Sequence, residues 1–399
     1  MSRPNQFLSP EGDLEDYFVD EYWLIDQWVG DTLWTWGRNT EGALGINNGL
    51  TRCTPVTTSA GGANWKQVTG GNHTPAIKTD GTLWIWGNNG NGQLGINNTT
   101  HRSTPVTTFA GGTNWKQVSV GNFHTAAIKT DGTLWTWGWN INGQLGDNTT
   151  TQRLTPVTTF AGGTNWKQVD CGAFHTAAIK TDGTLWSWGL NGNAQLGDNT
   201  TTQRLTPVTT FVGGNNWKQI AVATIHTSAI KTDGTLWLWG SNSYGQLGDN
   251  TTTNRSIPVT TFVGGNNWKQ VGGGGVHTAA IKTNGTLWTW GRNDTGQLGI
   301  NLSGLTTGRT TPVTTFAGGT NWKQVDCGGS GHTVAIKTDG TLWTWGFNSY
   351  GQLGDNTTIN RSIPGTTFAG GTNWKQVAAS VGANTAAVTS GTDPTYFIS

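Results

Sequence analysis

Two short apolar patterns recur along the whole chain. In the first, Leu-Trp-x-Trp-Gly, tryptophan occupies every second position, and in the second, Asn-Trp-Lys-Gln, a branched apolar residue follows the Gln. Alternation with a period of two is typical of β-strands, because successive side chains point to opposite faces of a sheet. Each pattern occurs seven times. The leading tryptophans of the first pattern are Trp34, Trp84, Trp135, Trp186, Trp237, Trp288 and Trp343, and those of the second are Trp65, Trp115, Trp166, Trp217, Trp268, Trp322 and Trp374.

Each repeat of about 51 residues predicts four strands. In one unit the predicted strands are residues 165–169, 175–180, 185–188 and 207–211. Asp182-Gly183 predicts a two-residue hairpin turn between the second and third strands. The fourth strand begins with a proline, which suits an edge strand because proline has no N–H to donate. Four strands in a unit of this length are typical of a propeller blade.

The two patterns are half a unit out of phase, so the chain begins and ends in mid-unit. The fold class predicted is therefore all-β, a seven-bladed β-propeller over residues 31–390. The closing blade is expected to combine residues 31–37 and 55–58 with 373–377 and 385–388, which removes the open edges of a linear array. Residues 1–30 are a separate leader, and 391–399 are a C-terminal tail.

The units resemble the repeat of the regulator of chromosome condensation family. The resemblance rests on Trp188-Gly189 with Gln195-Leu196-Gly197, after Val169-x-Cys171-Gly172 and His175-Thr176, and it extends from residue 31 to about 390. It implies a seven-bladed propeller and a role in binding other proteins. The family's best-known activity, nucleotide exchange on a small GTPase, is not expected here, because the leader is acidic and no wedge is inserted between the strands.

The composition argues against several classes of function. The net charge is +1 with no basic stripe, so nucleic-acid binding is not expected. No apolar run is long enough to span a bilayer, so membrane insertion is not expected either. The first residues lack the pattern of a secretory signal peptide. The three cysteines, Cys53, Cys171 and Cys327, are predicted to be free thiols in a reducing compartment.

The polar residues that repeat in register predict structure rather than chemistry. No nucleophile–base set, metal spacing or phosphate loop is found, so we expect no enzyme activity, metal or cofactor. Six histidines share one slot and are expected to form structural hydrogen bonds: His73, His124, His175, His226, His277 and His332. Asp147, Asp198, Asp249 and Asp355 are expected to cap loop turns. A calcium site there is disfavoured, because Ile46, Ile96 and Ile300 replace the aspartate in other units.

Tryptophan dominates the expected core. Twenty-one of the 24 tryptophans occupy three fixed slots and are predicted to pack between blades. The exceptions are Trp23, Trp28 and Trp139.

The units differ from one another mainly after Trp-Gly and before the repeated histidine. Both connections are expected to emerge on one rim of the disc, which an insertion at residues 302–308 enlarges. Exposed aromatic residues beside arginine are typical of a recognition surface, whereas neutral drift in loops is the alternative. The predicted partner-binding rim consists of Arg38, Trp139, Ile141, Leu190, Tyr244, Arg292, Phe347 and Tyr350.

The leader is acidic and aromatic: eight of the 22 acidic residues lie in the first 31 positions. It is predicted either to fold across the propeller's own face or to act as a docking arm on another protein, with homo-oligomerisation through the leader as one form of docking. Residues 14–26 resemble leaders of propeller proteins from marine tailed bacteriophages. The predicted docking residues are Leu14, Tyr17, Phe18, Tyr22, Trp23, Ile25 and Trp28.

The phage resemblance implies a non-enzymatic component of a virion, made in the host cytoplasm. Its leader is expected to bind another virion subunit, and its rim a host-surface ligand or a neighbouring subunit. The alternative is a cytoplasmic protein–protein interaction scaffold or regulator of the same propeller family.

Overall fold

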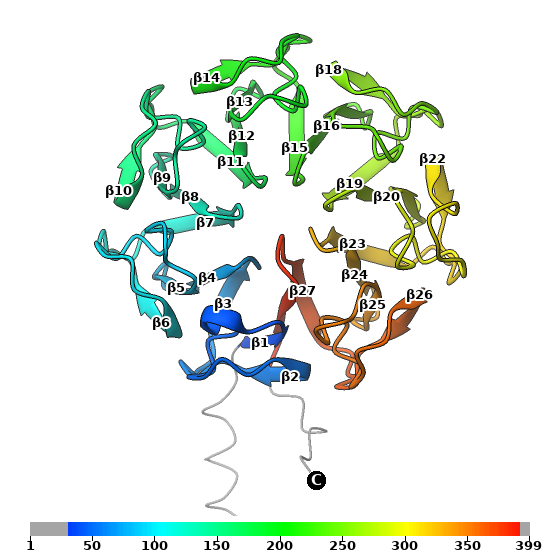
Figure 1. The fold of residues 1–399 in the computed structure, drawn as a ribbon, viewed down its shortest axis with the longest axis horizontal. Helices are drawn as coiled ribbons and strands as arrows, with labels where there is room; N and C mark the ends of the chain where they lie inside the picture. The colour runs from blue at the N-terminus through cyan, green and yellow to red at the C-terminus, as the bar shows by residue number, and fades with distance from the viewer. Residues whose placement is uncertain (1–30, 392–399) are drawn as a thin grey trace, which may run out of the picture.

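Seven four-stranded antiparallel sheets stand around a central channel in the computed structural model, which describes residues 31–391 (Figure 1). The predicted fold class is confirmed. The leader, with the docking residues expected in it, and residues 392–399 lie outside the described part of the chain.

Each blade uses its strands in order from the channel outwards. The innermost strands are β3 (Trp65–Val68), β7 (Trp115–Val120), β11 (Trp166–Cys171), β15 (Trp217–Val222), β19 (Trp268–Gly273), β23 (Trp322–Cys327) and β27 (Trp374–Ala379). The second strands are β4 (His73–Lys78), β8 (His124–Lys129), β12 (His175–Lys180), β16 (His226–Lys231), β20 (His277–Lys282), β24 (His332–Lys337) and β28 (Asn384–Thr389).

The two outer strands complete each sheet. The third strands are β5 (Leu83–Gly87), β9 (Leu134–Gly138), β13 (Leu185–Gly189), β17 (Leu236–Gly240), β21 (Leu287–Gly291), β25 (Leu342–Gly346) and β1 (Thr32–Gly37). The outermost strands are β6 (Arg102–Thr107), β10 (Arg153–Thr158), β14 (Arg204–Thr209), β18 (Arg255–Thr260), β22 (Arg309–Thr314), β26 (Arg361–Thr366) and β2 (Arg52–Thr57). A 3₁₀ turn, η2 (Thr40–Gly42), follows β1.

Two local predictions were wrong in detail. The outermost strand β14 begins at Arg204, three residues before the predicted start, and ends before Phe211. The hairpin between β12 and β13 has a three-residue loop, because the N–H of Lys180 bonds to the carbonyl of Thr184 at 3.0 Å. Only Gly183 in that loop has a positive φ, of 81°. This is a type I turn followed by a glycine, the usual three-residue hairpin loop.

The closing blade joins the two ends of the chain, as predicted. Its strand order is β2-β1-β28-β27, and β1 pairs with β28 in the register Leu33↔Val388 and Trp34↔Ala387. The backbone N–H of Arg38 also donates to the carbonyl of Ala383 at 2.9 Å. Residues more than 340 positions apart thus share one sheet, which leaves no blade without a neighbour.

Tryptophan and aliphatic side chains fill the space between neighbouring blades. Between the third and fourth full blades, Ile179 and Leu185 pack against Ile220 in a cluster that also buries Trp217 and Trp239. The two indoles meet edge to face, with centroids 6.2 Å apart. Equivalent clusters recur around the ring, so two of the three repeated tryptophan slots are core, as predicted.

The third slot, the leading Trp of Leu-Trp-x-Trp-Gly, is only partly buried. The ammonium group of Lys231 lies 4.7 Å from the ring centroid of Trp217 and 4.8 Å from that of Trp237. Six blades share this arrangement, with lysines 78, 129, 180, 231, 282 and 337. A cation held over indole faces contributes about 0.5–2 kcal/mol. The lysine therefore covers the indole face that the neighbouring blade leaves exposed.

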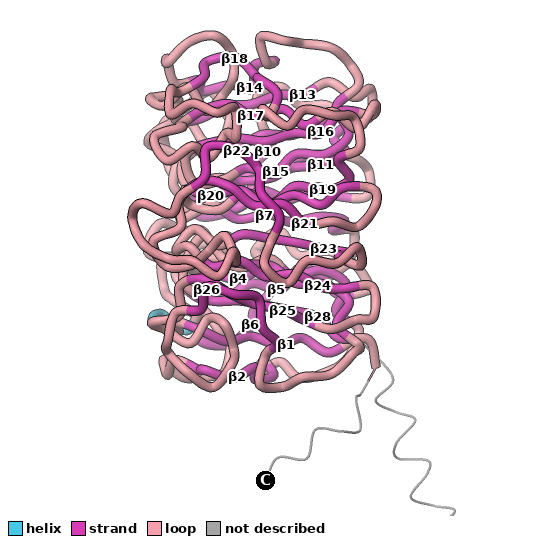
Figure 2. Tube along the Cα trace, turned by 90° about the vertical axis from the view of Figure 1, so that its right-hand side faces the viewer, coloured by secondary structure: helices cyan, strands magenta, loops and turns pink. Residues whose placement is uncertain are grey.

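The loops divide the disc into two faces, seen edge-on in Figure 2. The connections between first and second strands and between third and fourth strands share one face, because the N–H of Leu190 bonds to the carbonyl of Phe174 at 2.9 Å. We call this the rim face. The Asp-Gly hairpins lie on the opposite face, where residues 31 and 391 also lie; we call it the terminal face.

A ring of glutamines links the innermost strands around the channel. The side-chain amide of Gln117 donates to the carbonyl of Val169 at 3.1 Å and accepts from its N–H at 3.0 Å. Each innermost strand is the edge of its sheet, so these backbone groups have no strand partner. Gln67, Gln168, Gln270, Gln324 and Gln376 make the same pair of bonds to the next blade, and Gln219 makes only the bond to the carbonyl of Val271.

We expect Gln376→Ala to lower the free energy of unfolding by about 1–2 kcal/mol, because it uncovers the N–H and C=O of Val68. Urea denaturation measures the change. Gln168→Ala is the matched control, since it removes the same two bonds from Ile220 within the continuous part of the chain. If Gln168→Ala destabilises the protein and Gln376→Ala does not, the ring is not closed at the seam in solution.

Candidate functional site

Two carboxylates lie on the inner strands at the channel. Asp170 accepts from the hydroxyl of Ser119 at 2.6 Å and from the N–H of Val222 at 2.7 Å, so it joins three neighbouring blades. Asp326 accepts from the N–H groups of Cys327 and Ala379, both at 2.9 Å. These aspartates cap further edge N–H groups, next to those that the glutamines cover. The sequence did not reveal this role, because the other units have Thr, Ser, Ala or Gly in the slot.

Neither aspartate has a cationic partner at hydrogen-bond distance among the described residues. Burial raises the pKa of Asp170 despite the hydrogen bonds it accepts. Burial also raises the pKa of Asp326 to about 7, and the negative charge of Asp170 acts in the same direction. A raised carboxyl pKa means that stability contributed by the protonated form is lost as the pH rises through the folded-state pKa.

The six histidines form a second ring, deeper in the disc. The Nε2 of His226 lies 2.9 Å from the Oγ1 of Thr278 in the next blade. That hydroxyl donates to the backbone carbonyl of Gln246 at 2.8 Å, so its proton is already used and the histidine must be the donor. The tautomer is thereby fixed with the proton on Nε2. The other five histidines make the equivalent contact at 2.7–3.2 Å.

The histidine ring is structural, as predicted from its repetition. All six rings are buried, and burial lowers the pKa of His226 to about 3. The pKa values of the other five are lowered to about 3 or 4 by the same cause. Asn384 fills the slot in the closing blade and donates to the carbonyl of Gly71 at 3.0 Å. A neutral, inaccessible imidazole held as a donor is unsuited to acid–base catalysis.

The same carbonyl groups explain the Gln-Leu-Gly motif of each unit. The carbonyl of Gln246 also accepts from the indole Nε1 of Trp290 at 2.8 Å. Gly248 has a φ of 68°, and a Cβ there would lie 2.8 Å from that Nε1. The motif therefore lets the loop of one blade approach the buried tryptophan of the next.

The aspartates of the long loops cap turns, as expected, and also form ion pairs. Asp147 accepts from the N–H of Thr149 at 3.1 Å and pairs with Arg153 at 2.7 Å. Burial alone would raise the pKa of Asp147, but hydrogen bonds from Thr149 and Arg153 outweigh it and hold the pKa below its ordinary value. Asp198, Asp249 and Asp355 pair with Arg204, Arg255 and Arg361. An arginine thus neutralises the charge of each of these four carboxylates.

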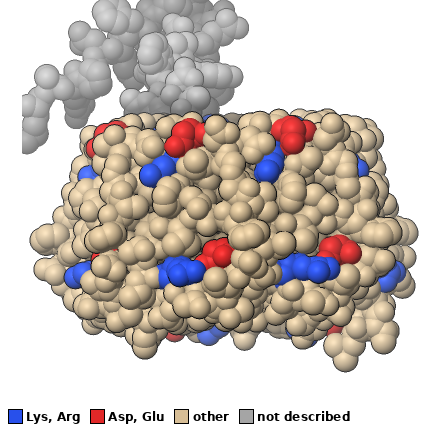
Figure 3. Space-filling view, turned by 90° about the horizontal axis from the view of Figure 1, so that it is seen from above, with Lys and Arg blue, Asp and Glu red and all other residues tan. Residues whose placement is uncertain are grey.

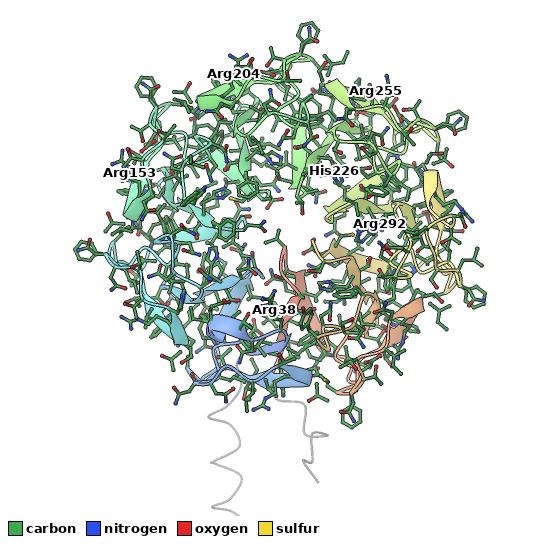
Figure 4. The ribbon with its side chains drawn as sticks, in the orientation of Figure 1. Arg38, Arg153, Arg204, His226, Arg255 and Arg292 are labelled. Carbon is green, nitrogen blue, oxygen red and sulfur yellow. The ribbon has the colours of Figure 1, made fainter. Side chains whose placement is uncertain are left out.

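These ion pairs lie on the outer wall. Figure 4 places Arg153, Arg204 and Arg255 at the outer edge of the disc, whereas Arg38, His226 and Arg292 lie nearer to the axis. Figure 3 shows acidic and basic side chains next to one another in two bands around this wall. Such pairing gives the wall little net field to steer a charged ligand.

The two variable sets of residues meet on the rim face. In each blade the residue after Trp-Gly donates its N–H to the carbonyl of the residue before the histidine slot, at 2.8–3.0 Å. Trp139, for example, is bound in this way to Phe123 at 2.8 Å. Phe123 in turn packs against Phe174 of the next blade, with centroids 6.0 Å apart. The sequence variation therefore forms one connected circle of side chains above a constant framework.

Two aromatic–arginine groups stand out on this circle. The guanidinium of Arg292 lies over the ring of Tyr244 at 5.1 Å and pairs with Asp294 at 2.5 Å. Two blades further along the ring, Arg38 lies over the ring of Tyr350 at 5.5 Å, and Tyr350 contacts Phe347 edge to face at 6.1 Å. In both groups the tyrosine comes from one blade and the arginine from the next.

The remaining predicted rim residues vary in exposure. Ile141 is 57% exposed, whereas Trp139, Leu190 and Phe347 are half-buried. The insertion at residues 302–308 contributes Leu305, which is 85% exposed. All eight predicted residues lie on the β1–β2 connection or its equivalents in the other blades. Their role in binding stays a prediction.

A belt of exposed phenylalanines on the outer edge was not predicted from the sequence. Phe109, Phe160, Phe211, Phe262, Phe316 and Phe368 each follow an outermost strand and are 61–67% exposed. The closing blade has Ser59 in this slot. The predicted fourth strand, residues 207–211, includes Phe211. The strand ends at Thr209 instead, and the Phe211 ring is exposed.

No three His, Cys, Asp or Glu side chains within residues 31–391 lie close enough to hold a metal ion. No helix in the same range is long and apolar enough to cross a membrane. All three cysteines are free, and Cys171 and Cys327 are buried.

Known proteins share both sequence and fold with this chain. A family model described as the RCC1-like domain matches residues 29–267, and models of the regulator of chromosome condensation (RCC1) repeat match residues 284–336 and 339–388. The ultraviolet-B receptor UVR8 of Arabidopsis thaliana is 35% identical over 346 residues, which are 84% of this chain and 77% of that protein. The mitochondrial RCC1 domain-containing protein RUG3 of the same plant is 29% identical over 67% of this chain and 62% of its own length.

Two solved structures show the same fold. Human WBSCR16 superimposes with a TM-score of 0.77 at 21% identity, covering 91% of this chain and all of that one. Prp20p from Saccharomyces cerevisiae, a protein studied for its binding to Gsp1p and histones, gives a TM-score of 0.76 at 19% identity, covering 92% of both chains. At this identity the likeness concerns the fold alone.

We expect His226→Asn to make stability less dependent on acid pH. As the pH falls below about 6.5, this histidine is protonated in the unfolded chain but stays neutral in the folded protein. The free energy of unfolding of the wild type therefore falls by up to about 1.4 kcal/mol per pH unit because of this site. At pH 8 the free energy of unfolding of the variant should be about 1–3 kcal/mol lower than that of wild type, because Asn is too short to reach Thr278. That deficit should shrink by about 2–3 kcal/mol at pH 4 in urea denaturation.

Thr278→Val is the matched control for this experiment, because it removes the acceptor of the same hydrogen bond without removing a titrating group. Its deficit should stay constant with pH. The raised pKa of Asp326 makes the free energy of unfolding change with pH in the opposite direction. This effect is the same in wild type and in both variants, so it cancels from the difference between them. A His226→Asn deficit that does not change between pH 8 and pH 4 would contradict a neutral buried histidine.

Proposed function

Because the chain belongs to the family of regulator of chromosome condensation (RCC1) repeat propellers, we propose that it is a non-enzymatic protein-recognition module whose rim face binds another protein. The observation that carries the proposal is the circle of variable side chains on that face. The framework beneath the circle repeats from blade to blade, so a change at the rim leaves the buried tryptophan and glutamine contacts between blades intact.

The rim side chains are held ready for binding. Each residue after Trp-Gly is fixed by its backbone bond to the neighbouring loop. Tyr244 is further fixed by its N–H, which donates to the side chain of Gln246 at 2.9 Å, and Tyr350 is fixed in the same way by Gln352. Rigid aromatic residues lose little conformational entropy on binding, which is one reason they dominate interface energetics.

Tyr244 with Arg292 and Tyr350 with Arg38 are the best candidates for the centre of an interface. Tyrosine and arginine are the residue types most enriched among energetically dominant interface positions. Tyr244 is 44% exposed and Tyr350 is 40% exposed, so both have apolar area left to bury. The partner class we propose is therefore a protein, as for Prp20p, which binds Gsp1p and histones.

Two settings fit such a module. One is a virion component that displays the disc through its leader, supported by the resemblance of residues 14–26 to phage leaders. The other is a cytoplasmic scaffold or regulator like other members of the family. Mass spectrometry of purified virus particles from the source that encodes the chain distinguishes them: copies that stay with the particles through density-gradient purification support the first, and their absence supports the second.

The rim proposal is tested by photo-crosslinking from chosen positions in the full chain. A photoreactive residue at Tyr244 or Phe347 should capture the same partner, whereas one at Asp182 on the terminal face or Phe211 on the outer edge should not. Equal capture from Asp182 would contradict binding at the rim.

Once a partner is captured, Tyr244→Ala combined with Arg292→Ala should weaken its affinity about 10-fold or more. The melting temperature should change little, because neither side chain belongs to a blade-to-blade cluster. Phe160→Ala, which removes an equally exposed aromatic side chain from the outer edge, is the control and should leave affinity unchanged.

A further inference from the structure

Seven lysines form a ring on the terminal face. Each is the second residue of an innermost strand, just after the buried tryptophan that begins it, and each is exposed. Because these strands run from the terminal face to the rim face, their first residues all lie at the same end of the channel. The lysine ring consists of Lys66, Lys116, Lys167, Lys218, Lys269, Lys323 and Lys375.

The terminal face as a whole carries positive charge. Six more lysines end the second strands, over their tryptophans, so thirteen lysines lie on this face. The acidic residues here are Asp31 and the hairpin aspartates 80, 131, 182, 233 and 339, which leaves a formal charge of +7. The hairpin aspartates are bound to their own loops: Asp182 accepts from the N–H and hydroxyl of Thr184 at 2.9 and 2.7 Å.

One ring lysine already has an acidic partner from the beginning of the described chain. Lys375 forms an ion pair with Asp31, the first described residue. The other six ring lysines make no ion pair within residues 31–391. The position of Asp31 therefore brings the start of the leader to the edge of the lysine ring.

The leader has the complementary charge. Residues 1–30 contain seven acidic residues and one arginine, a formal charge of −6, and all seven acidic residues fall between Glu11 and Asp26. An extended chain spans about 3.3–3.6 Å per residue, so these positions reach across the terminal face from Asp31. Covalent attachment also gives the leader an effective local concentration of about millimolar, which favours it over a free acidic peptide.

We propose that residues 11–31 dock on the lysine ring of their own propeller. Ion pairs of acidic side chains with the six unpaired lysines would continue the Lys375–Asp31 pair around the ring. Exposed pairs are individually weak, worth about 0–1 kcal/mol, so docking depends on their number and on low salt. The rim face stays free, so this inference is independent of the rim partner proposed above, although it competes with docking of the leader on a virion subunit.

Zero-length carbodiimide crosslinking of the full chain tests the proposal, because it joins only carboxylates and amines in contact. At low salt, mass spectrometry should find Glu11 to Asp26 linked to ring lysines other than Lys375. The yield should fall several-fold in 0.5 M NaCl. An equal mixture of ¹⁴N- and ¹⁵N-labelled chains distinguishes the occupant: links within one isotope support self-docking, and links mainly between isotopes would overturn it in favour of a second copy.

A leader-neutralised full chain supplies the matched control. With Asp13→Asn, Glu15→Gln, Asp16→Asn, Asp20→Asn and Glu21→Gln, the six unpaired ring lysines should react several-fold faster with an acetylating reagent than in wild type. The lysines over tryptophan, such as Lys231, should react at the same rate in both chains. Equal reactivity of the ring lysines in the two chains, or carboxylate links spread evenly over all thirteen lysines, would refute docking on the ring.

Discussion

The disc depends on how the innermost strand of each sheet is covered at the channel. An edge strand leaves every second N–H and C=O without a partner, and seven such edges face one another here. A glutamine from the preceding blade covers one N–H and one C=O of the next, so each blade needs its neighbour. The bridges run in one direction around the ring, and the last, from Gln376 to Val68, joins the end of the chain to its beginning.

Apolar and polar contacts hold neighbouring blades together in different parts of each interface. Indole and aliphatic side chains fill the wide outer part of each interface, where the cost of a cavity is greatest. Near the axis the blades are too close for large side chains, and glutamine, aspartate and the histidine–threonine pairs replace them. Because the interfaces use these fixed residues, the loops of the rim face can differ in every blade without weakening the ring.

The features of the fold that depend on local sequence pattern were predicted correctly. Seven copies of two motifs, half a unit apart, predicted the blade count and the shared closing blade, and the repeated histidine slot predicted a structural role. The sequence did not predict what depends on how two sheets meet. Gln168 looks like a polar residue at a strand start, and Phe211 like part of a strand. Only the packing shows that the first spans two blades and the second points outwards.

Amide hydrogen exchange at the channel edge tests this account most directly. The N–H groups of Val68, Val118 and Val169 have no strand partner but donate to a glutamine side chain, whereas Val271 has only the bond that its carbonyl accepts from Gln219. The account predicts that the first three exchange nearly as slowly as the paired amides of β12, at the seam as elsewhere, and that Val271 exchanges faster. If Val68 and Val169 exchange as fast as exposed loop amides, the glutamine ring does not close the propeller.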